Sequence, residues 1–225
     1  MDRLGNKELV FVAGIEGSGT SIILKLLSMP SFAIALGGNY FSPPTPDYNT
    51  EAQCLHLNSL TESLWRYSIP LQSGQRKIIL DEISGLSVPD KFTHVIYKRS
   101  YPFKNMNYFP NLKDLGEITH NARVIILRRS LAENAASILR RKFVATIEDA
   151  IERINLANKV ISKQLKILDG MRVLEISYAD LVASPVDILD RIEAFLEFPK
   201  MSLVRHSPLI KSRKKSHDLL KKNEE

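Results

Sequence analysis

The chain has 225 residues, of which 44% are hydrophobic and 25% are charged, and it contains a single cysteine, Cys54. This length and composition are those of an ordinary globular protein with one sizeable core, and a lone cysteine excludes an intrachain disulfide framework and a cysteine-based zinc site. The formal net charge of +6 is mild, so we expect anionic small ligands and no specific nucleic-acid binding.

We expect a protein without a membrane segment. No apolar stretch approaches the roughly 20 residues that cross a bilayer. A strand is predicted to start near Glu8, which leaves no room for a signal peptide before it, so a reducing, cytoplasmic compartment is expected. The sequence carries no indication of the oligomeric state.

The first half of the chain alternates apolar strand patterns with helix patterns. LVFVA at 9–13 is a continuous apolar run, typical of a strand buried on both faces. A helix with an apolar side is predicted directly after it, over 18–28. The further elements predicted in this half are a strand over 32–36, a proline-rich loop over 42–49, helices over 50–65 and 77–86, and a strand over 93–97.

The second half of the chain repeats this alternation. RVIIL at 123–127 predicts a buried strand, and Ser130 with Glu133 forms a capping box for a helix that runs to about residue 142. Apolar residues recur at three- and four-residue steps from Ile147 to Leu168, which predicts a long amphipathic helix. The last elements predicted are a strand over 172–176 and a helix over 185–196.

Strands that alternate with helices imply a parallel sheet with right-handed crossovers. We therefore predict a single α/β domain over residues 1–216, with a parallel sheet flanked by helices. A basic, flexible tail is expected over 217–225.

The turn between the first strand and the first helix has the sequence GIEGSGTS, residues 14–21, and we call it the phosphate loop. A glycine-rich turn at a helix N-terminus exposes backbone N–H groups, which bind anions together with the helix dipole. The residues expected to bind a phosphate here are the glycines Gly14, Gly17 and Gly19 and the hydroxyl residues Ser18, Thr20 and Ser21.

One position of the loop departs from the nucleotide triphosphatase pattern. The spacing is G-x-x-x-x-G-T-S, with Thr20 where a Walker loop has lysine. That lysine reaches the β- and γ-phosphates of a triphosphate, and threonine cannot. The sequence therefore favours a ligand with a small 5′ group over ATP.

A second phosphate anchor is predicted behind the strand over 123–127. Arg129 stands at the strand end and Ser137 lies eight residues later, inside the next helix. In an open α/β sheet the strand end and the first helical turns border the crevice where ligands bind. Arginine offers a planar fork for phosphate, and a serine hydroxyl adds a bond.

Together these segments resemble the sulfotransferases that use 3′-phosphoadenosine 5′-phosphosulfate (PAPS). The phosphate loop resembles the family's P-[KR]-S-G-T-[TS] loop for the 5′-phosphosulfate. Arg129, Glu133 and Ser137 have the spacing of its R-[ND]-P-x-[DE]-x-x-x-S segment for the 3′-phosphate. ISYADLVASPVDILDRIEAFLEF, at 176–198, is very similar to a structural segment near the family's C-terminus.

The resemblance implies a P-loop-like parallel sheet and transfer of a sulfuryl group from PAPS to an acceptor hydroxyl of a small molecule, glycan or peptide. The product nucleotide is then adenosine 3′,5′-bisphosphate (PAP). Metal is not required for this chemistry, and the five histidines are scattered through the sequence, so no metal site is expected.

Gly17 departs from the family pattern, because the family has a basic residue there. Lys98, in VIYKRSYP at 95–102, resembles the lysine of a family K-[ST]-P segment and is expected to supply the missing charge, with Arg99 as the substitute. A lysine in place of Gly17 is then expected to restore part of the rate of a Lys98 variant.

The general base is the second departure. Related enzymes often carry a Glu in a G-E pair after the second strand, where this chain reads LGGN at 36–39. Glu51 and His56, just downstream, are the candidates that we expect to act as base. Glu16, inside the phosphate loop, would oppose a bound anion unless it faces away.

Two other functions fit the sequence. A small P-loop kinase is the first, although IILDE at 78–82 is its only candidate for a magnesium site. A nucleotide-binding protein without catalysis is the second, suggested by Gly17 and the missing base.

Overall fold

The computed structural model describes residues 7–36, 54–55, 77–78, 81–82, 88–101, 112–114, 119, 121–168 and 170–210. Over these ranges the chain forms a parallel sheet with the strand order β3-β2-β4-β1-β5-β6. The strands are β1 (Glu8–Ile15), β2 (Ala33–Leu36), β3 (Cys54–Leu55), β4 (His94–Tyr101), β5 (Ala122–Arg128) and β6 (Arg172–Ser177).

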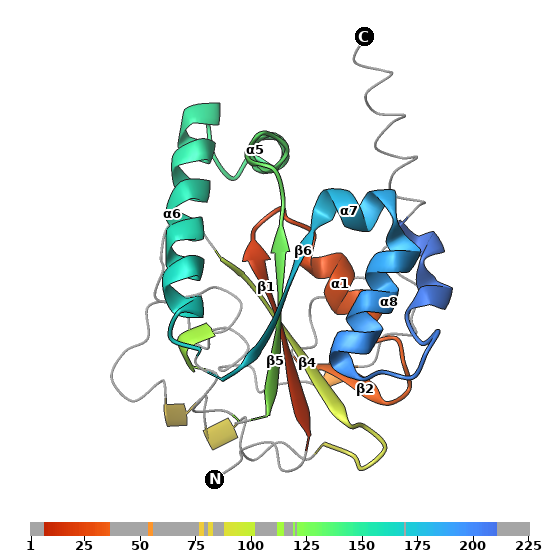
Figure 1. Ribbon diagram of the computed structural model, residues 1–225. Helices are drawn as coiled ribbons and strands as arrows, with labels where there is room; N and C mark the ends of the chain where they lie inside the picture. Colours follow the sequence, from red (N-terminus) through yellow and green to blue (C-terminus); the bar gives the residue numbers. More distant parts are fainter. Residues whose placement is uncertain are drawn as a thin grey trace.

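Helices cover both faces of the sheet, with α6 on the left and α1 and α8 on the right in Figure 1. The helices are α1 (Thr20–Leu27), α5 (Leu131–Arg140), α6 (Ile147–Leu165), α7 (Tyr178–Ala183) and α8 (Pro185–Leu196), and two 3₁₀ turns are η2 (Leu112–Asp114) and η3 (Val204–His206). This confirms the predicted α/β class, a parallel sheet flanked by helices.

β1 shows why the central strands are apolar without interruption. Leu9 and Phe11 belong to the core between the sheet and α5 and α6, whereas Val10 and Val12 belong to the core between the sheet and α1 and α8. Because successive side chains point to opposite faces, a strand covered on both faces needs apolar residues at every position. All eight residues of β1 are buried.

Two predicted elements are corrected, and one element was not predicted. Cys54–Leu55, inside the helix predicted over 50–65, forms a short strand beside β2; the rest of that range lies outside the described residues. β4 continues four residues beyond its predicted end at Tyr97, because the charged residues after Tyr97 are buried. α7 was not predicted, since six residues are too few for a helical period to show.

Of the helix predicted over 77–86, residues 77–78 and 81–82 are described, and they are helical. The long amphipathic helix is confirmed as α6, with Ile154 and Ile161 buried and Ile147 and Ile151 exposed. Among the described residues no helix is long and apolar enough to cross a bilayer. The tail predicted over 217–225 lies outside the described residues.

The register brings three strand ends together. Gly14 of β1 is opposite Ser100 of β4 and Leu127 of β5. The carboxyl ends of these parallel strands therefore form one edge, which is where ligands bind in open α/β sheets.

Candidate functional site

The phosphate loop leaves the carboxyl end of β1 and enters α1. Two of its glycines have left-handed backbones, with φ of 87° at Gly17 and 100° at Gly19. Gly19 is the N-cap of α1 and provides no side-chain hydrogen bond to it. Because the first N–H groups of a helix lack intrahelical partners, this N-terminus is available to an anion.

Neighbouring atoms also leave little room for a side chain at the loop glycines. A Cβ atom on Gly14 would lie 2.5 Å from Ser18 Oγ, and one on Gly19 would lie 2.6 Å from the ring of Tyr178. A Cβ on Gly17 would lie 2.9 Å from Asn134 Oδ1 and 3.3 Å from Ser137 Oγ. The loop is therefore packed between α5 and the start of α7.

Two hydroxyls at the start of α1 are held by β4. Thr20 Oγ1 lies 2.9 Å from Ser100 Oγ, within hydrogen-bond distance. Lys98 donates from Nζ to Ser21 Oγ at 3.1 Å. Thr20, at the position of the Walker lysine, is buried beside β4.

Arg129 lies directly against the phosphate loop. Its Nη1 donates to the Gly17 carbonyl oxygen at 2.9 Å, and its guanidinium lies 4.6 Å from the centre of the Tyr178 ring. Glu133 Oε2 is 3.8 Å from Arg129 Nε. The arginine thus bridges the phosphate loop, α5 and the start of α7.

Buried polar atoms gather on the α5 side of Gly17. Ser137 and Asn134 are 2% and 1% exposed, and neither Ser137 Oγ nor Asn134 Oδ1 has a hydrogen-bond partner in the structure. Ser18 Oγ, in the loop itself, is also buried and has no hydrogen-bond partner among the described residues. Buried polar groups are almost always satisfied in proteins, so this cluster fits a polar ligand that completes its hydrogen bonds.

Lys98 and Arg99 point to opposite faces of β4. Lys98 is 6% exposed and lies on the face of α1, where it bonds Ser21. Burial lowers the Lys98 pKa to about 8, against the raising effect of the Glu16 carboxylate. Arg99 shares the other face with Tyr97 and Tyr101, in the core beneath α6.

This alternation corrects one expectation. Arg99 cannot substitute for Lys98, because it points away from the face of α1 that carries Ser21. A lysine at position 17 would be strained, because the backbone φ there is left-handed and its Cβ would lie 2.9 Å from Asn134 Oδ1; the rescue of a Lys98 variant by Gly17→Lys stays a prediction.

Glu16 is half-buried between the phosphate loop and β4. Its backbone N–H donates to the Tyr101 carbonyl oxygen at 3.4 Å, and its carboxylate interacts electrostatically with Lys98 and Arg141. Burial raises the Glu16 pKa, and the two cations partly offset this.

The two candidate bases, Glu51 and His56, lie outside the described residues. Among the residues that are described, no group of three or more His, Cys, Asp and Glu side chains is arranged to hold a metal ion.

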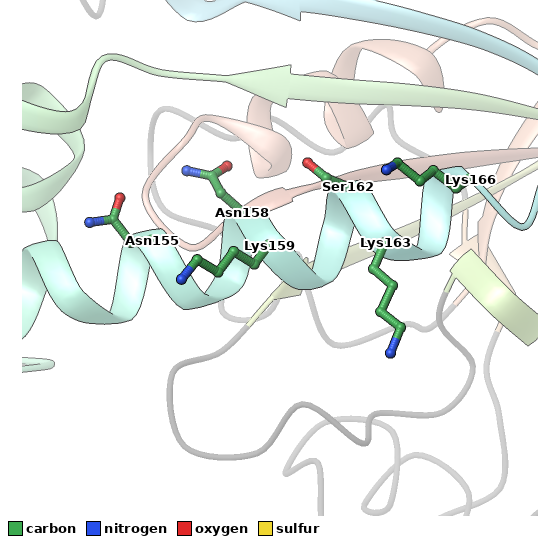
Figure 2. Close-up of a pocket in the computed structure, with 6 residues that line it drawn as sticks. All are labelled: Asn155, Asn158, Lys159, Ser162, Lys163 and Lys166. Carbon is green, nitrogen blue, oxygen red and sulfur yellow. The ribbon is translucent and has the colours of Figure 1, made fainter.

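A polar groove of about 560 Å³ runs along α6 (Figure 2). Its described lining residues come from that helix and its C-cap residue: Asn155, Asn158, Lys159, Ser162, Lys163 and Lys166. Arg128, next to Arg129 in the chain, donates to Asn158 Oδ1 at 3.0 Å. None of the described lining residues belongs to the phosphate loop or α5, so the groove is distinct from the candidate site.

Comparison with known proteins identifies the family of the chain. The model of the sulfotransferase family matches residues 10–202, which include the phosphate loop, Lys98, Arg129 and Ser137. The chain therefore belongs to the sulfotransferase family. None of the curated proteins matches it.

Solved sulfotransferases share the fold at low identity. The enzyme from Alicyclobacillus acidocaldarius is 15% identical, with a TM-score of 0.53 over 86% of this chain and 82% of that chain. STF1 from Mycobacterium tuberculosis is 15% identical, with a TM-score of 0.55 over 93% and 72%. Mouse SULT7A1, solved in complex with PAP, is 13% identical, with a TM-score of 0.50 over 89% and 63%.

Sequence reasoning missed two residues that touch the phosphate loop. Asn134 sits one turn before Ser137 on α5, and this helical spacing is the signal that was available. Tyr178, the first residue of α7, belongs to the C-terminal segment that was interpreted as structural, and it contacts both Gly19 and Arg129. No local pattern indicates the contacts of Tyr178, because they join residues far apart in the sequence.

Gly17→Ala tests the packing of the loop. Gly17 and Gly170 both have left-handed backbones, but a Cβ at Gly170 would meet nothing within 4 Å. We expect Gly170→Ala to cost about 1 kcal/mol of unfolding free energy, from backbone strain alone. Gly17→Ala should cost more, because the methyl group also meets Asn134. Chemical denaturation of both variants measures the difference, and equal losses would contradict the packing described here.

Proposed function

We propose that this sulfotransferase transfers a sulfuryl group from PAPS to an acceptor hydroxyl. The observation that carries the proposal is the meeting of two phosphate-binding features at Gly17. On one side is the N-terminus of α1 with its loop, and on the other are Arg129 and Ser137, which lie against Gly17. A nucleotide with phosphate groups at both its 5′ and 3′ positions would engage both features.

The residues present fit such a ligand. The loop N–H groups and the α1 dipole would hold the 5′-phosphosulfate. Arg129 would hold the 3′-phosphate, and the Ser137 hydroxyl, buried without a partner, would donate to it. No metal is needed for these contacts.

Lys98 would assist the leaving group. It is fixed by Ser21 at the first turn of α1, so its charge lies beside the loop that would hold the phosphosulfate. Negative charge grows on the bridging oxygen as the sulfuryl group leaves, and a cation fixed in advance stabilises that charge. Lys98 would thus do from β4 what a basic residue at position 17 does in the family pattern.

The first experiment asks which nucleotide the protein binds. We expect PAP to stabilise the protein against heat by about 2.7 kcal/mol at a concentration 100 times its Kd. ATP should stabilise much less, because Thr20, which bonds Ser100, offers no cation for a triphosphate. Thermal unfolding with PAP, ATP and buffer is the measurement. Equal stabilisation by ATP would favour the kinase instead.

Arg129 and Arg128 form a matched pair for testing the 3′-phosphate contact. Arg129→Ala should weaken PAP binding by about 2 kcal/mol, the size of a lost charge-assisted bond. The effect on AMP, which lacks the 3′-phosphate, should be much smaller. Arg128→Ala should change neither affinity, because Arg128 bonds Glu175 and Asn158 instead. Titration calorimetry measures the affinities of both variants for PAP and AMP. Equal weakening of PAP and AMP binding in Arg129→Ala would show that Arg129 acts only by holding the phosphate loop.

Lys98→Met should lower the turnover of PAPS on the order of 100-fold, as for one lost transition-state donor, and change PAP affinity little. In the parent, kcat/KM should fall as the pH rises above about 8, because Lys98 then loses its proton and its charge. Lys98→Met should not show this fall of kcat/KM at high pH. Slow hydrolysis of PAPS serves as the assay, and Lys159→Met on α6 is the control. If Lys98→Met turned over PAPS at the rate of the parent, Lys98 would not be the residue that stabilises the leaving group.

A further inference from the structure

Asn134 is a polar residue at a buried position of α5, and the reaction proposed above gives it no role. The other buried residues of this helix are Ala135, Ser137 and Ile138. Asn134 is 1% exposed, and its Oδ1 atom has no hydrogen-bond partner among the described residues. A buried carbonyl oxygen without a donor is costly, so packing alone would favour an apolar residue here. The carboxamide is therefore suited to a hydrogen-bond donor that arrives with a ligand.

Asn134 lies between the two phosphate anchors of the proposed nucleotide site. A Cβ atom on Gly17 would lie 2.9 Å from Asn134 Oδ1 and 3.3 Å from Ser137 Oγ, so both oxygens border the same point of the phosphate loop. α5 lies just beyond the end of β5, at the edge of the sheet where this loop begins (Figure 1). Asn134 is thus beside the residue that would donate to the 3′-phosphate, and against the loop that would hold the 5′ group.

The chemistry of the nucleotide indicates which of its groups meets an acceptor at this place. Phosphate oxygens accept hydrogen bonds, so they do not satisfy Asn134 Oδ1. The ribose of PAP carries phosphate at its 3′ and 5′ positions, which leaves the 2′-hydroxyl as its free hydroxyl. This hydroxyl is attached to the carbon next to the one that bears the 3′-phosphate. The other donor of the nucleotide, the adenine amine, is at the far end of the base.

We propose that Asn134 Oδ1 accepts a hydrogen bond from the ribose 2′-hydroxyl of the bound nucleotide, an assignment that rests on the function proposed above. Ser137 and Asn134 stand three residues apart on one face of α5, so they would bind neighbouring substituents of the same sugar. A carboxamide accepts this bond without placing a negative charge beside the 3′-phosphate. Asn134 then selects ribonucleotides over 2′-deoxyribonucleotides.

The test measures the affinities for PAP and for 2′-deoxyadenosine 3′,5′-bisphosphate (2′-deoxy-PAP) by titration calorimetry. The parent should bind PAP about 10-fold more tightly than 2′-deoxy-PAP, the scale of one hydrogen bond. Asn134→Leu, a change to an apolar side chain of similar size, should bind PAP about 10-fold more weakly than the parent and 2′-deoxy-PAP about as well. The control is Asn155→Leu, at an exposed position of α6, which should leave both affinities unchanged.

Asn134→Asp separates hydrogen bonding from packing. It keeps an acceptor oxygen and nearly the shape of asparagine, so it should still prefer PAP over 2′-deoxy-PAP. Its negative charge near the phosphates should weaken the binding of both ligands. Circular dichroism checks the fold of each variant. If Asn134→Leu does not fold, Asn134→Ala takes its place, because alanine favours a helix and introduces no new contact.

The outcomes separate this contact from the proposed function. A parent that binds PAP and 2′-deoxy-PAP equally overturns the assignment. So does an Asn134→Leu protein that keeps the parental preference while it binds both ligands more weakly, because that result shows a role in packing the loop at Gly17. Loss of the preference in Asn134→Asp overturns the assignment as well. These three results leave the nucleotide site standing, whereas a parent that does not bind PAP overturns both.

Discussion

The pairing of β1 with β4 on one side and β5 on the other is the constraint on which the site depends. Gly14 lies opposite Ser100 and Leu127 in this register, so the loop after β1 leaves the sheet between the ends of two other strands. One neighbour supplies Lys98 and Ser100, and the other leads into Arg129 and α5. A shift of one residue in either pairing would send these side chains to the wrong faces.

The conformation of the loop also depends on side chains outside the sheet, which pack against its glycines. At Gly17 and Gly19 the backbone adopts left-handed angles, and the space that side chains would fill is taken by α5 and Tyr178. The loop is thus shaped by elements that come more than a hundred residues later. Lys98, on the neighbouring strand β4, bonds Ser21 at the end of the same loop.

Sequence alone was sufficient where the physical signal was local. The central strands were predicted because burial on both faces leaves an uninterrupted apolar run, and α8 was predicted with its observed bounds, 185–196, because Pro185 follows a serine and opens an amphipathic pattern. The strand at Cys54–Leu55 was not predicted, because two residues are too few to show the alternation of a strand. Prediction also failed to extend β4 through Lys98 and Arg99, because buried charges resemble a loop until their surroundings are known. Asn134 and Tyr178 were missed since their contacts with the loop are made in space and not along the chain.

The stacking of Tyr178 against Gly19 and Arg129 has a consequence for how the protein matures. The loop leaves the ribosome well before its neighbour Tyr178, which follows β6 about 160 residues later along the chain. Contacts of such sequence separation are slow to form, and synthesis proceeds at only about 5–20 residues per second. The nascent chain therefore spends seconds with an unfinished phosphate loop. The loop reaches its final packing only once the segment that carries Tyr178 has docked.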